Sequence, residues 1–212
     1  MIRRPPRSTQ GVSSAASDVY KRQVLTRLVQ GEGDGVKLTE PELLHNCIFL
    51  LNAGHETTTN LIGNGLHALI KHREQLERLA ADPDLIDTAV EELLRFESPL
   101  QLNNRLTIEP IEVNGIEIPA GCFLTLGVGA ANNDPVQFDQ PEQLDIGRAP
   151  NNHVAFGQGH HACSGMNVAR LEGRIAFGRI VARFPRIDLA TRPERDERVR
   201  FRGFRRLPAT LG

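Results

Sequence analysis

The chain has 212 residues, enough for one sizeable hydrophobic core or two small ones. Its 25 basic and 26 acidic residues nearly cancel, so charge gives no reason to expect a nucleic-acid partner. No apolar run reaches the length of a membrane span, and the first residues lack the apolar core of a secretion signal. Three widely spaced cysteines argue against a disulfide framework. We therefore expect a cytoplasmic protein.

The first 23 residues differ from the rest of the chain. They are rich in Arg, Pro and Ser and have no periodic apolar face. This composition predicts disorder, because it offers too little apolar surface to bury. We interpret residues 1–23 as a leader left by cloning or sequence assembly rather than a natural flexible tail, and expect the folded part to be residues 24–212.

Apolar residues with a helical period predict most of the remaining elements. A short helix over 24–30 precedes a glycine-rich loop. The capping box Thr39-Glu40-Pro41-Glu42 then starts a helix that continues to about His72, a length of roughly 50 Å. The same period predicts three more helices. They cover residues 71–81, 86–96 and 166–184.

The middle of the long helix has an unusual composition. Ala53-Gly54-His55-Glu56 is followed by three threonines, which are poor helix formers. Their hydroxyls can bond back to earlier carbonyls, distort the helix and open a groove for a ligand. The alternative is a polar helix face that is turned to solvent.

Residues 100–126 predict short strands instead. Leu106–Val113 alternates between apolar and polar residues, and Asn114-Gly115 is a strong hairpin turn signal. The whole pattern predicts a mainly α protein with small β-hairpins, an α+β fold class.

A loop from Phe156 to Gly165 contains one cysteine, Cys163, among three glycines, directly before the last helix. Glycines at this density let the backbone turn tightly and approach a large flat group closely. Turn amides and a helix N-terminus near the sulfur favour the thiolate. Such a thiolate can be a nucleophile, a redox thiol or a metal ligand.

The loop matches Phe-Gly-x-Gly-x-His-x-Cys-x-Gly in full and resembles the haem-binding loop of the cytochromes P450, in their soluble bacterial form. The resemblance implies the C-terminal half of the P450 fold, with haem b bound through the thiolate of Cys163 as the iron ligand. It also implies that Phe156 and Gly157 lie against the haem and that His161 meets a propionate.

Two other kinds of site are less consistent with the residues of this loop. Zinc bound by His160, His161 and Cys163 would need a second cluster of ligands, and the sequence has none. A Cys–His hydrolase would need a separate base and orienting residue that nothing marks. Haem needs one axial protein ligand, because the macrocycle supplies four.

Two helical motifs extend the resemblance. Ala53-Gly54-x-Glu56-Thr57 is similar to the family's central-helix motif. It implies that Ala53 and Gly54 line the space above the iron and that Glu56 and Thr57 deliver protons to bound dioxygen.

Glu92-x-x-Arg95 would ordinarily be an exposed ion pair between residues one helical turn apart, worth a few tenths of a kcal/mol. Its position between the two motifs is that of the family's buried pair, which braces the haem pocket. We expect Arg148 to be a third member.

The resemblance also assigns residues in the strands and near the C-terminus. It implies that Arg105 holds a haem propionate and that Leu100 and Leu102 face the substrate. Phe204, in Arg202-Gly203-Phe204, would belong to a final turn that enters the substrate pocket.

The implied activity is insertion of one oxygen atom from O2 into an apolar organic substrate, with electrons from a ferredoxin or flavoprotein. A complete family member is about twice as long, so we expect a truncated fragment that alone binds haem poorly. The alternatives are a peroxide-using haem-thiolate enzyme, which would not need Glu56 and Thr57, and a non-catalytic truncated product.

Overall fold

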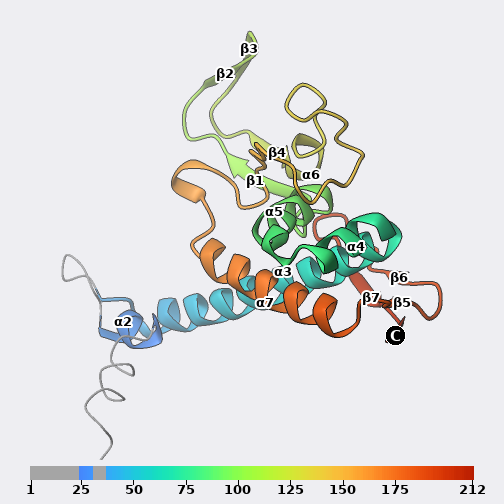
Figure 1. Cartoon of the computed structure of the whole chain (residues 1–212). Coiled ribbons are helices and arrows are strands. Elements are labelled where there is room, and N and C mark those ends of the chain that lie inside the picture. The colour runs from blue at the N-terminus through green and yellow to red at the C-terminus, as the bar shows by residue number, and fades with distance from the viewer. Residues whose placement is uncertain (1–23, 31–36) are drawn as a thin grey trace, which may run out of the picture. The chain divides into compact units, whose positions relative to one another are not determined.

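The computed structural model describes residues 24–30 and 37–212 (Figure 1). The predicted leader, residues 1–23, lies outside the described residues. The chain divides into two compact units, residues 1–53 and 54–212. The architecture is mainly α-helical with small antiparallel strand pairs, which confirms the fold class predicted from the sequence.

Helices hold most of the residues in regular secondary structure, and the apolar period of the sequence predicted every described α-helix except the short one at Val128–Ala131. The helices are α2 (Val24–Gln30), α3 (Glu40–Lys71), α4 (Arg73–Ala81), α5 (Ile86–Phe96), α6 (Val128–Ala131) and α7 (Met166–Arg183), with 3-10 turns η1 (Pro83–Leu85) and η2 (Gly159–His161). The short helices α2 and α5 have the predicted bounds, and α3 and α7 end within one residue of theirs.

The long helix α3 begins at the predicted capping box. Thr39 N donates to Glu42 Oε2 at 2.8 Å, and Glu42 N donates to Thr39 Oγ1 at 3.5 Å. In the threonine-rich middle, Thr59 Oγ1 donates to the carbonyl of His55 at 2.8 Å, a back-bond of the expected kind. The helix nevertheless runs unbroken from Glu40 to Lys71, so this bond does not interrupt it.

The described strands form four separate antiparallel pairs. Asn114 and Gly115 both have positive φ, 51° and 78°, and turn the chain between β2 and β3 as the hairpin signal predicted. The predicted short strands are present, and the alternating stretch Leu106–Val113 is divided between the first two of them; between them, the Thr107 hydroxyl donates to Pro119 O at 2.7 Å. The pairs are β1 (Leu102–Leu106) with β4 (Phe123–Gly127), β2 (Ile111–Val113) with β3 (Ile116–Ile118), β5 (Asp188–Leu189) with β8 (Ala209–Thr210), and β6 (Glu194–Arg195) with β7 (Phe204–Arg206).

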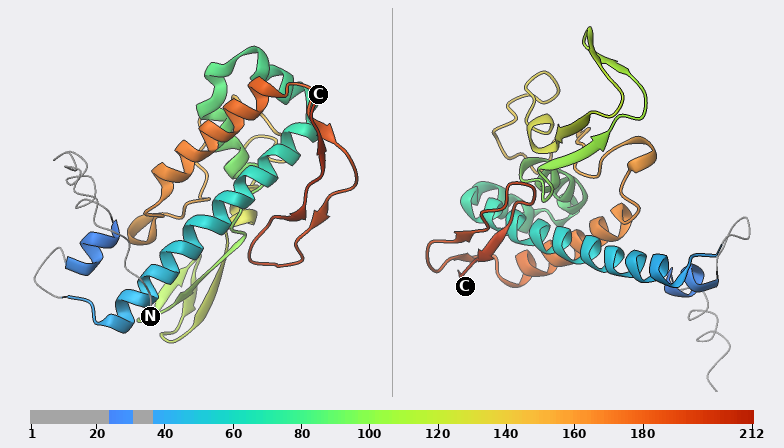
Figure 2. Two further views of the ribbon diagram at one scale, coloured as in Figure 1. Left: turned by 90° about the horizontal axis from the view of Figure 1, so that it is seen from below. Right: turned by 180° about the vertical axis from the view of Figure 1, so that it is seen from behind.

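Within residues 54–212, the C-terminal part of α3 lies beside α5 and α7 around one apolar core (Figure 2). The approach is close at Gly65 of α3, where a built Cβ would lie 2.4 Å from the ring of Phe177 on α7. At Gly173 of α7 a Cβ would lie 3.2 Å from Val90 of α5. Glycine therefore lets the three helices pack at these points. The largest fully buried apolar side chains are Phe177, Leu61, Leu69, Leu76, Leu93 and Ile146.

No helix among the described residues has the length and apolar character needed to cross a membrane.

Candidate functional site

The cysteine loop is shaped by backbone hydrogen bonds and two glycines. Cys163 N donates to Phe156 O at 2.9 Å, and Gly157 N donates to Val154 O at 2.9 Å. Gly157 and Gly159 have φ of 68° and 69°, a region that side chains disfavour. A built Cβ at Gly159 would meet nothing within 4 Å, so the backbone turn, not crowding, requires glycine there.

Cys163 is the exposed member of the three free cysteines, whereas Cys47 and Cys122 are half-buried. Helix α7 starts immediately behind it, and Met166 N donates to Cys163 O at 3.3 Å. The thiol is therefore open to a group from outside the chain, at the end of a long helix where unpaired N–H groups favour negative charge.

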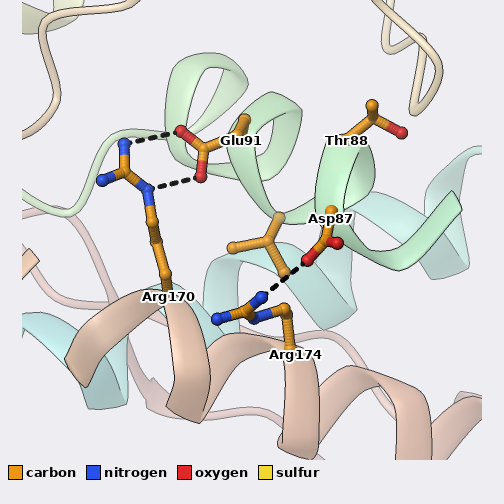
Figure 3. Close-up of a pocket in the computed structure, with 6 residues that line it drawn as sticks. Asp87, Thr88, Glu91, Arg170 and Arg174 are labelled. Atoms are coloured by element: carbon orange, nitrogen blue, oxygen red, sulfur yellow. Dashed lines mark hydrogen bonds and ion pairs between the residues drawn. The ribbon is translucent and has the colours of Figure 1, made fainter. Parts of the chain in front are cut away.

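Behind the loop, Phe156 packs between two polar side chains. The guanidinium carbon of Arg170, on α7, lies 4.8 Å from the Phe156 ring centroid, and the His153 and Phe156 ring centroids are 6.0 Å apart. Arg170 also forms a two-pronged ion pair with Glu91 of α5, with Nε–Oε1 and Nη2–Oε2 distances of 2.7 and 2.9 Å (Figure 3). The loop, α5 and α7 are thus joined through one arginine.

Glu91 has a strongly perturbed pKa. Burial acts to raise the pKa of Glu91, but hydrogen bonds from His153 and Arg170 outweigh it and lower the value from 4.5 to about 2. The carboxyl is therefore ionised throughout the neutral range.

The predicted pair Glu92–Arg95 is buried, with both side chains at 0% exposure. Arg95 Nε donates to Glu92 Oε2 at 2.8 Å, and Arg95 Nη2 donates to Glu92 Oε1 at 2.9 Å. Arg148 Nε lies 3.2 Å from both oxygens of the same carboxylate, so the structure brings all three residues together. Each charge has a partner, as burial requires.

This cluster continues toward the cysteine loop through asparagines that sequence reasoning missed. Asn151 Nδ2 donates to Glu92 Oε2 at 3.0 Å. Arg95 Nη1 donates to the carbonyl of buried Asn132 at 2.8 Å, and Asn132 Oδ1 accepts from Val154 N at 2.8 Å. Polar side chains therefore connect α5 to the segment directly before Phe156.

Glu56 and Thr57 are adjacent on α3, and both are half-buried. The structure pairs Glu56 with Arg198, from the C-terminal segment, and Arg198 also binds Asp196, with Nη2–Oδ2 at 2.6 Å. Sequence reasoning did not foresee this partner. Ala53 and Gly54, one turn earlier, are exposed, and a Cβ built at Gly54 would meet nothing within 4 Å.

The two residues expected to hold propionates differ in their surroundings. Arg105 is half-buried on β1 and its Nη1 donates to Asn104 O at 2.8 Å. In the described part of the chain, no carboxylate lies within ion-pair distance of Arg105. Its charge is therefore available to an outside anion. His161 is exposed, in the 3-10 turn η2 just before Cys163.

The residues expected to face substrate are separated. Leu102 lines an open cavity of about 550 Å³ together with Arg198 and Val199. Leu100 bridges to Phe201 beside that cavity. Phe204 instead packs on α3, with its ring centroid 4.8 Å from that of His67 and 4.0 Å from the guanidinium carbon of Arg195.

No local sequence signal announces these missed contacts. Glu91 precedes the Glu92-x-x-Arg95 motif and Arg170 lies seven residues after Cys163, but 79 residues separate the two partners. The sequence offers one hint, the adjacent acids Glu91 and Glu92. Neighbouring residues on a helix point in different directions, so the two carboxylates need different partners.

The sequence and the fold were compared with known proteins. A family model, Cytochrome P450, matches residues 9–204. A curated relative, "Polyketide biosynthesis cytochrome P450 PksS" of Bacillus subtilis (strain 168), is 44% identical over 195 residues, which are 90% of this chain and 48% of the relative. "Vitamin D(3) 25-hydroxylase" of Pseudonocardia autotrophica is 46% identical over 189 residues, 87% of this chain and 47% of the relative.

Solved structures agree with this result. P450BioI, in complex with an acyl carrier protein ligated to hexadec-9Z-enoic acid, has a TM-score of 0.83 and 45% identity over 88% of this chain and 48% of that one. The tirandamycin C-bound monooxygenase TamI has a TM-score of 0.84 and 38% identity over 92% of this chain and 51% of that one. The chain therefore spans about half the length of these relatives. From its matched residues and its fold, this chain belongs to the cytochrome P450 family.

Proposed function

We propose that this chain forms the iron-ligating, C-terminal half of a haem-thiolate monooxygenase. The observation that carries the proposal is Cys163, an exposed thiol at the start of α7 in a loop turned by two glycines of positive φ. The family membership supports haem as the group bound there. Coverage of 48% of the PksS relative supports the view that the complete enzyme has a second half.

Three features of the residues fit haem. The thiol of Cys163 is open to an outside ligand, a Cβ built at Gly159 of the same loop would meet nothing within 4 Å, and Arg105 has no carboxylate partner among the described residues. A porphyrin needs one axial sulfur, space for a planar ring and cations for its propionates. In this proposal Cys163 holds the iron, Arg105 and His161 hold propionates, and Phe156 with Gly157 lies against the ring.

The remaining residues have supporting roles. When bound, thiolate-ligated haem supplies the activation of dioxygen and the transfer of one oxygen atom to an apolar organic substrate. Glu92, Arg95 and Arg148 hold the segment that leads into the cysteine loop, since Asn132 connects them to Val154.

On α3, the hydroxyl of Thr57 and the carboxyl of Glu56 pass protons inward, while Ala53 and Gly54 keep the helix surface free of bulk. Leu100, Leu102 and the turn that contains Phe204 contribute to the substrate pocket. A ferredoxin or flavoprotein supplies the electrons.

Haem titration tests the proposal. We expect the 212-residue chain alone to form little of the ferrous–CO absorption band of a thiolate-ligated haem, and the full-length enzyme to form it completely. Cys163→Ser should abolish that band in the full-length enzyme, because the band depends on a sulfur ligand to the iron. An unchanged spectrum in this variant would overturn the proposal.

Substitutions on α3 distinguish oxygen activation from peroxide use. Thr57→Ala and Glu56→Gln should slow O2-dependent product formation in the full-length enzyme by about 100-fold or more, the scale of general acid–base catalysis. Undiminished turnover by both variants with O2 would contradict the assigned proton path, and efficient turnover with peroxide alone would favour the peroxide-using alternative.

A second candidate is a non-catalytic truncated product, since the chain spans 48% of the PksS relative and the family fold needs both halves to enclose haem. The upstream reading frame separates the two. A natural gene that encodes the other half supports the enzyme, whereas its absence supports the truncated product.

A further inference from the structure

The ion pair between Arg170 and Glu91 has no role in the function proposed above. It lies at a pocket of about 230 Å³ between α5 and α7, and Arg170 reaches across from α7 to meet the carboxylate (Figure 3). Both side chains are partly shielded from solvent, with 32% and 27% exposure. Such shielding makes the electrostatic effect of each charge on its surroundings stronger than that of a fully exposed group.

Arg170 is connected to the cysteine ligand by two contacts. Its guanidinium carbon stacks 4.8 Å from the centroid of the Phe156 ring. The carbonyl of Phe156 accepts the backbone hydrogen bond of Cys163 at 2.9 Å. The position of the Phe156 residue therefore affects the orientation of the Cys163 backbone, and Arg170 holds the Phe156 ring.

The two side chains also act on each other electrostatically. The hydrogen bond to Glu91 raises the pKa of Arg170, and the negative charge of Glu91 adds to this effect. The guanidinium is thus a charged packing partner of Phe156, the residue whose carbonyl accepts from Cys163 N. Glu91, ionised at neutral pH, offsets part of that positive charge.

We propose that Arg170 and Glu91 are positioning residues that act on the Cys163 ligand through Phe156 and together set the reduction potential of the haem iron. The proposal rests on the function proposed above. One-electron reduction from ferric to ferrous iron lowers the net charge of the site by one, so a nearby cation favours the reduced state and a nearby anion opposes it.

The opposite signs of the two partners make the proposal testable. Arg170→Gln removes the cation and should lower the potential. Glu91→Gln leaves the cation unbalanced and should raise it. Each change should alter the ferrous-to-ferric ratio at a fixed potential by about three- to tenfold, the latter equal to 59 mV for one electron. Arg170→Lys keeps the positive charge, so its reduction potential should lie close to that of the unsubstituted enzyme.

A matched control lies one helical turn away. Arg174 and Asp87 line the same pocket and pair at 3.0 Å, but their side chains are 42% and 70% exposed, and Arg174 makes no ring contact with Phe156 among the described contacts. Arg174→Gln should leave the potential where it is in the unsubstituted enzyme.

The measurement is a mediated spectroelectrochemical titration of the haem-loaded full-length enzyme and its four variants, with the ferrous–CO band recorded for each. Shifts of opposite sign for Arg170→Gln and Glu91→Gln, with Arg174→Gln unmoved, support the proposal. Shifts of the same sign, or no shift, overturn it, because a purely structural pair would be damaged in the same way by either change.

A haem-free measurement separates loss of folding from loss of tuning. In thermal unfolding of the haem-free full-length protein, Arg170→Gln and Glu91→Gln should both lower the Tm. The reduction potentials of the two haem-loaded variants should instead shift in opposite directions. If the unsubstituted enzyme binds haem through Cys163 and the potentials do not diverge, this inference fails alone. If Cys163→Ser leaves the haem spectrum unchanged, the proposed function fails with it.

Discussion

Glu92 is a charged residue in a site that excludes water. Its carboxylate is fully buried and accepts hydrogen bonds from Arg95, Arg148, Asn151 and the backbone of Asp145. A buried ion pair of this kind contributes little net stability when intact, because the desolvation of both ions offsets their attraction. Removal of Arg95 is different, since it takes the fully buried cation and two hydrogen bonds away from Glu92 in a site that excludes water.

Arg95→Met should therefore lower the free energy of unfolding by about 3–5 kcal/mol. The control is Arg206→Met, which breaks the exposed pair with Glu194, where the side chains are 70% and 59% exposed. That change should lower the free energy of unfolding by less than about 1 kcal/mol. Urea unfolding measures the free energy of unfolding of both variants. Equal losses for the two variants would show that burial of the Glu92 cluster does not determine its energetics.

Glu91 predicts an acid-dependent loss of stability. Because its pKa falls from 4.5 to about 2 on folding, the ionised carboxylate stabilises the folded state above pH 4.5, and this contribution disappears as the pH falls toward 2. After allowance for partial exposure, it amounts to about 1–2 kcal/mol. Glu91→Gln should flatten the dependence of the free energy of unfolding on pH in this window. An unchanged acid slope would contradict the assignment.

At the scale of elements, the packing of α3 on α7 depends on a missing side chain. Gly65 sits where a Cβ would overlap the buried Phe177 ring at 2.4 Å, and that ring has 0% exposure. In a core at crystal-like density, neither the ring nor the helix has room to move away. The glycine therefore fixes how closely the two helices approach.

Gly65→Ala should destabilise the protein by about 1–3 kcal/mol, since overpacking outweighs the gain in helix propensity. Gly178→Ala provides a matched control on α7, because a Cβ there meets nothing within 4 Å. That variant should be neutral or more stable by up to about 1 kcal/mol. Thermal unfolding compares them. A Gly65→Ala variant as stable as Gly178→Ala would show that Phe177 relaxes freely.

At the scale of the whole molecule, an apolar stripe remains uncovered on α7. Val168, Leu171 and Ile175 follow one helical face and are 59%, 50% and 48% exposed. A contiguous exposed stripe of large apolar side chains favours association, whereas a single exposed apolar residue does not.

The 212-residue chain should therefore self-associate at micromolar concentration, and Leu171→Glu with Ile175→Glu should reduce this by at least severalfold, as measured by light scattering. Val136→Glu is the control, because Val136 is an isolated surface residue at 94% exposure. Its variant should associate like the unsubstituted chain. If Val136→Glu reduced self-association equally, the added negative charge alone would explain the effect.

The sequence by itself determined what depends on neighbours along the chain. Periodicity and the Thr39 capping box set the helix bounds, Asn114-Gly115 set the β2–β3 turn, and the spacing around Cys163 indicated the family. These signals are local, because caps, turns and helix faces use residues within about four positions of one another.

Apart from Arg148, which the resemblance placed with Glu92, only the tertiary structure decided which distant charges meet. Arg170 and Glu91 are 79 residues apart, Glu56 and Arg198 lie on α3 and the C-terminal segment, and the Thr107 hydroxyl donates to the carbonyl of Pro119. Partners of this kind are chosen when helices pack, and many arginines and acids in one chain would pair equally well by charge. Packing geometry selects among them, and no local pattern in the sequence encodes that choice.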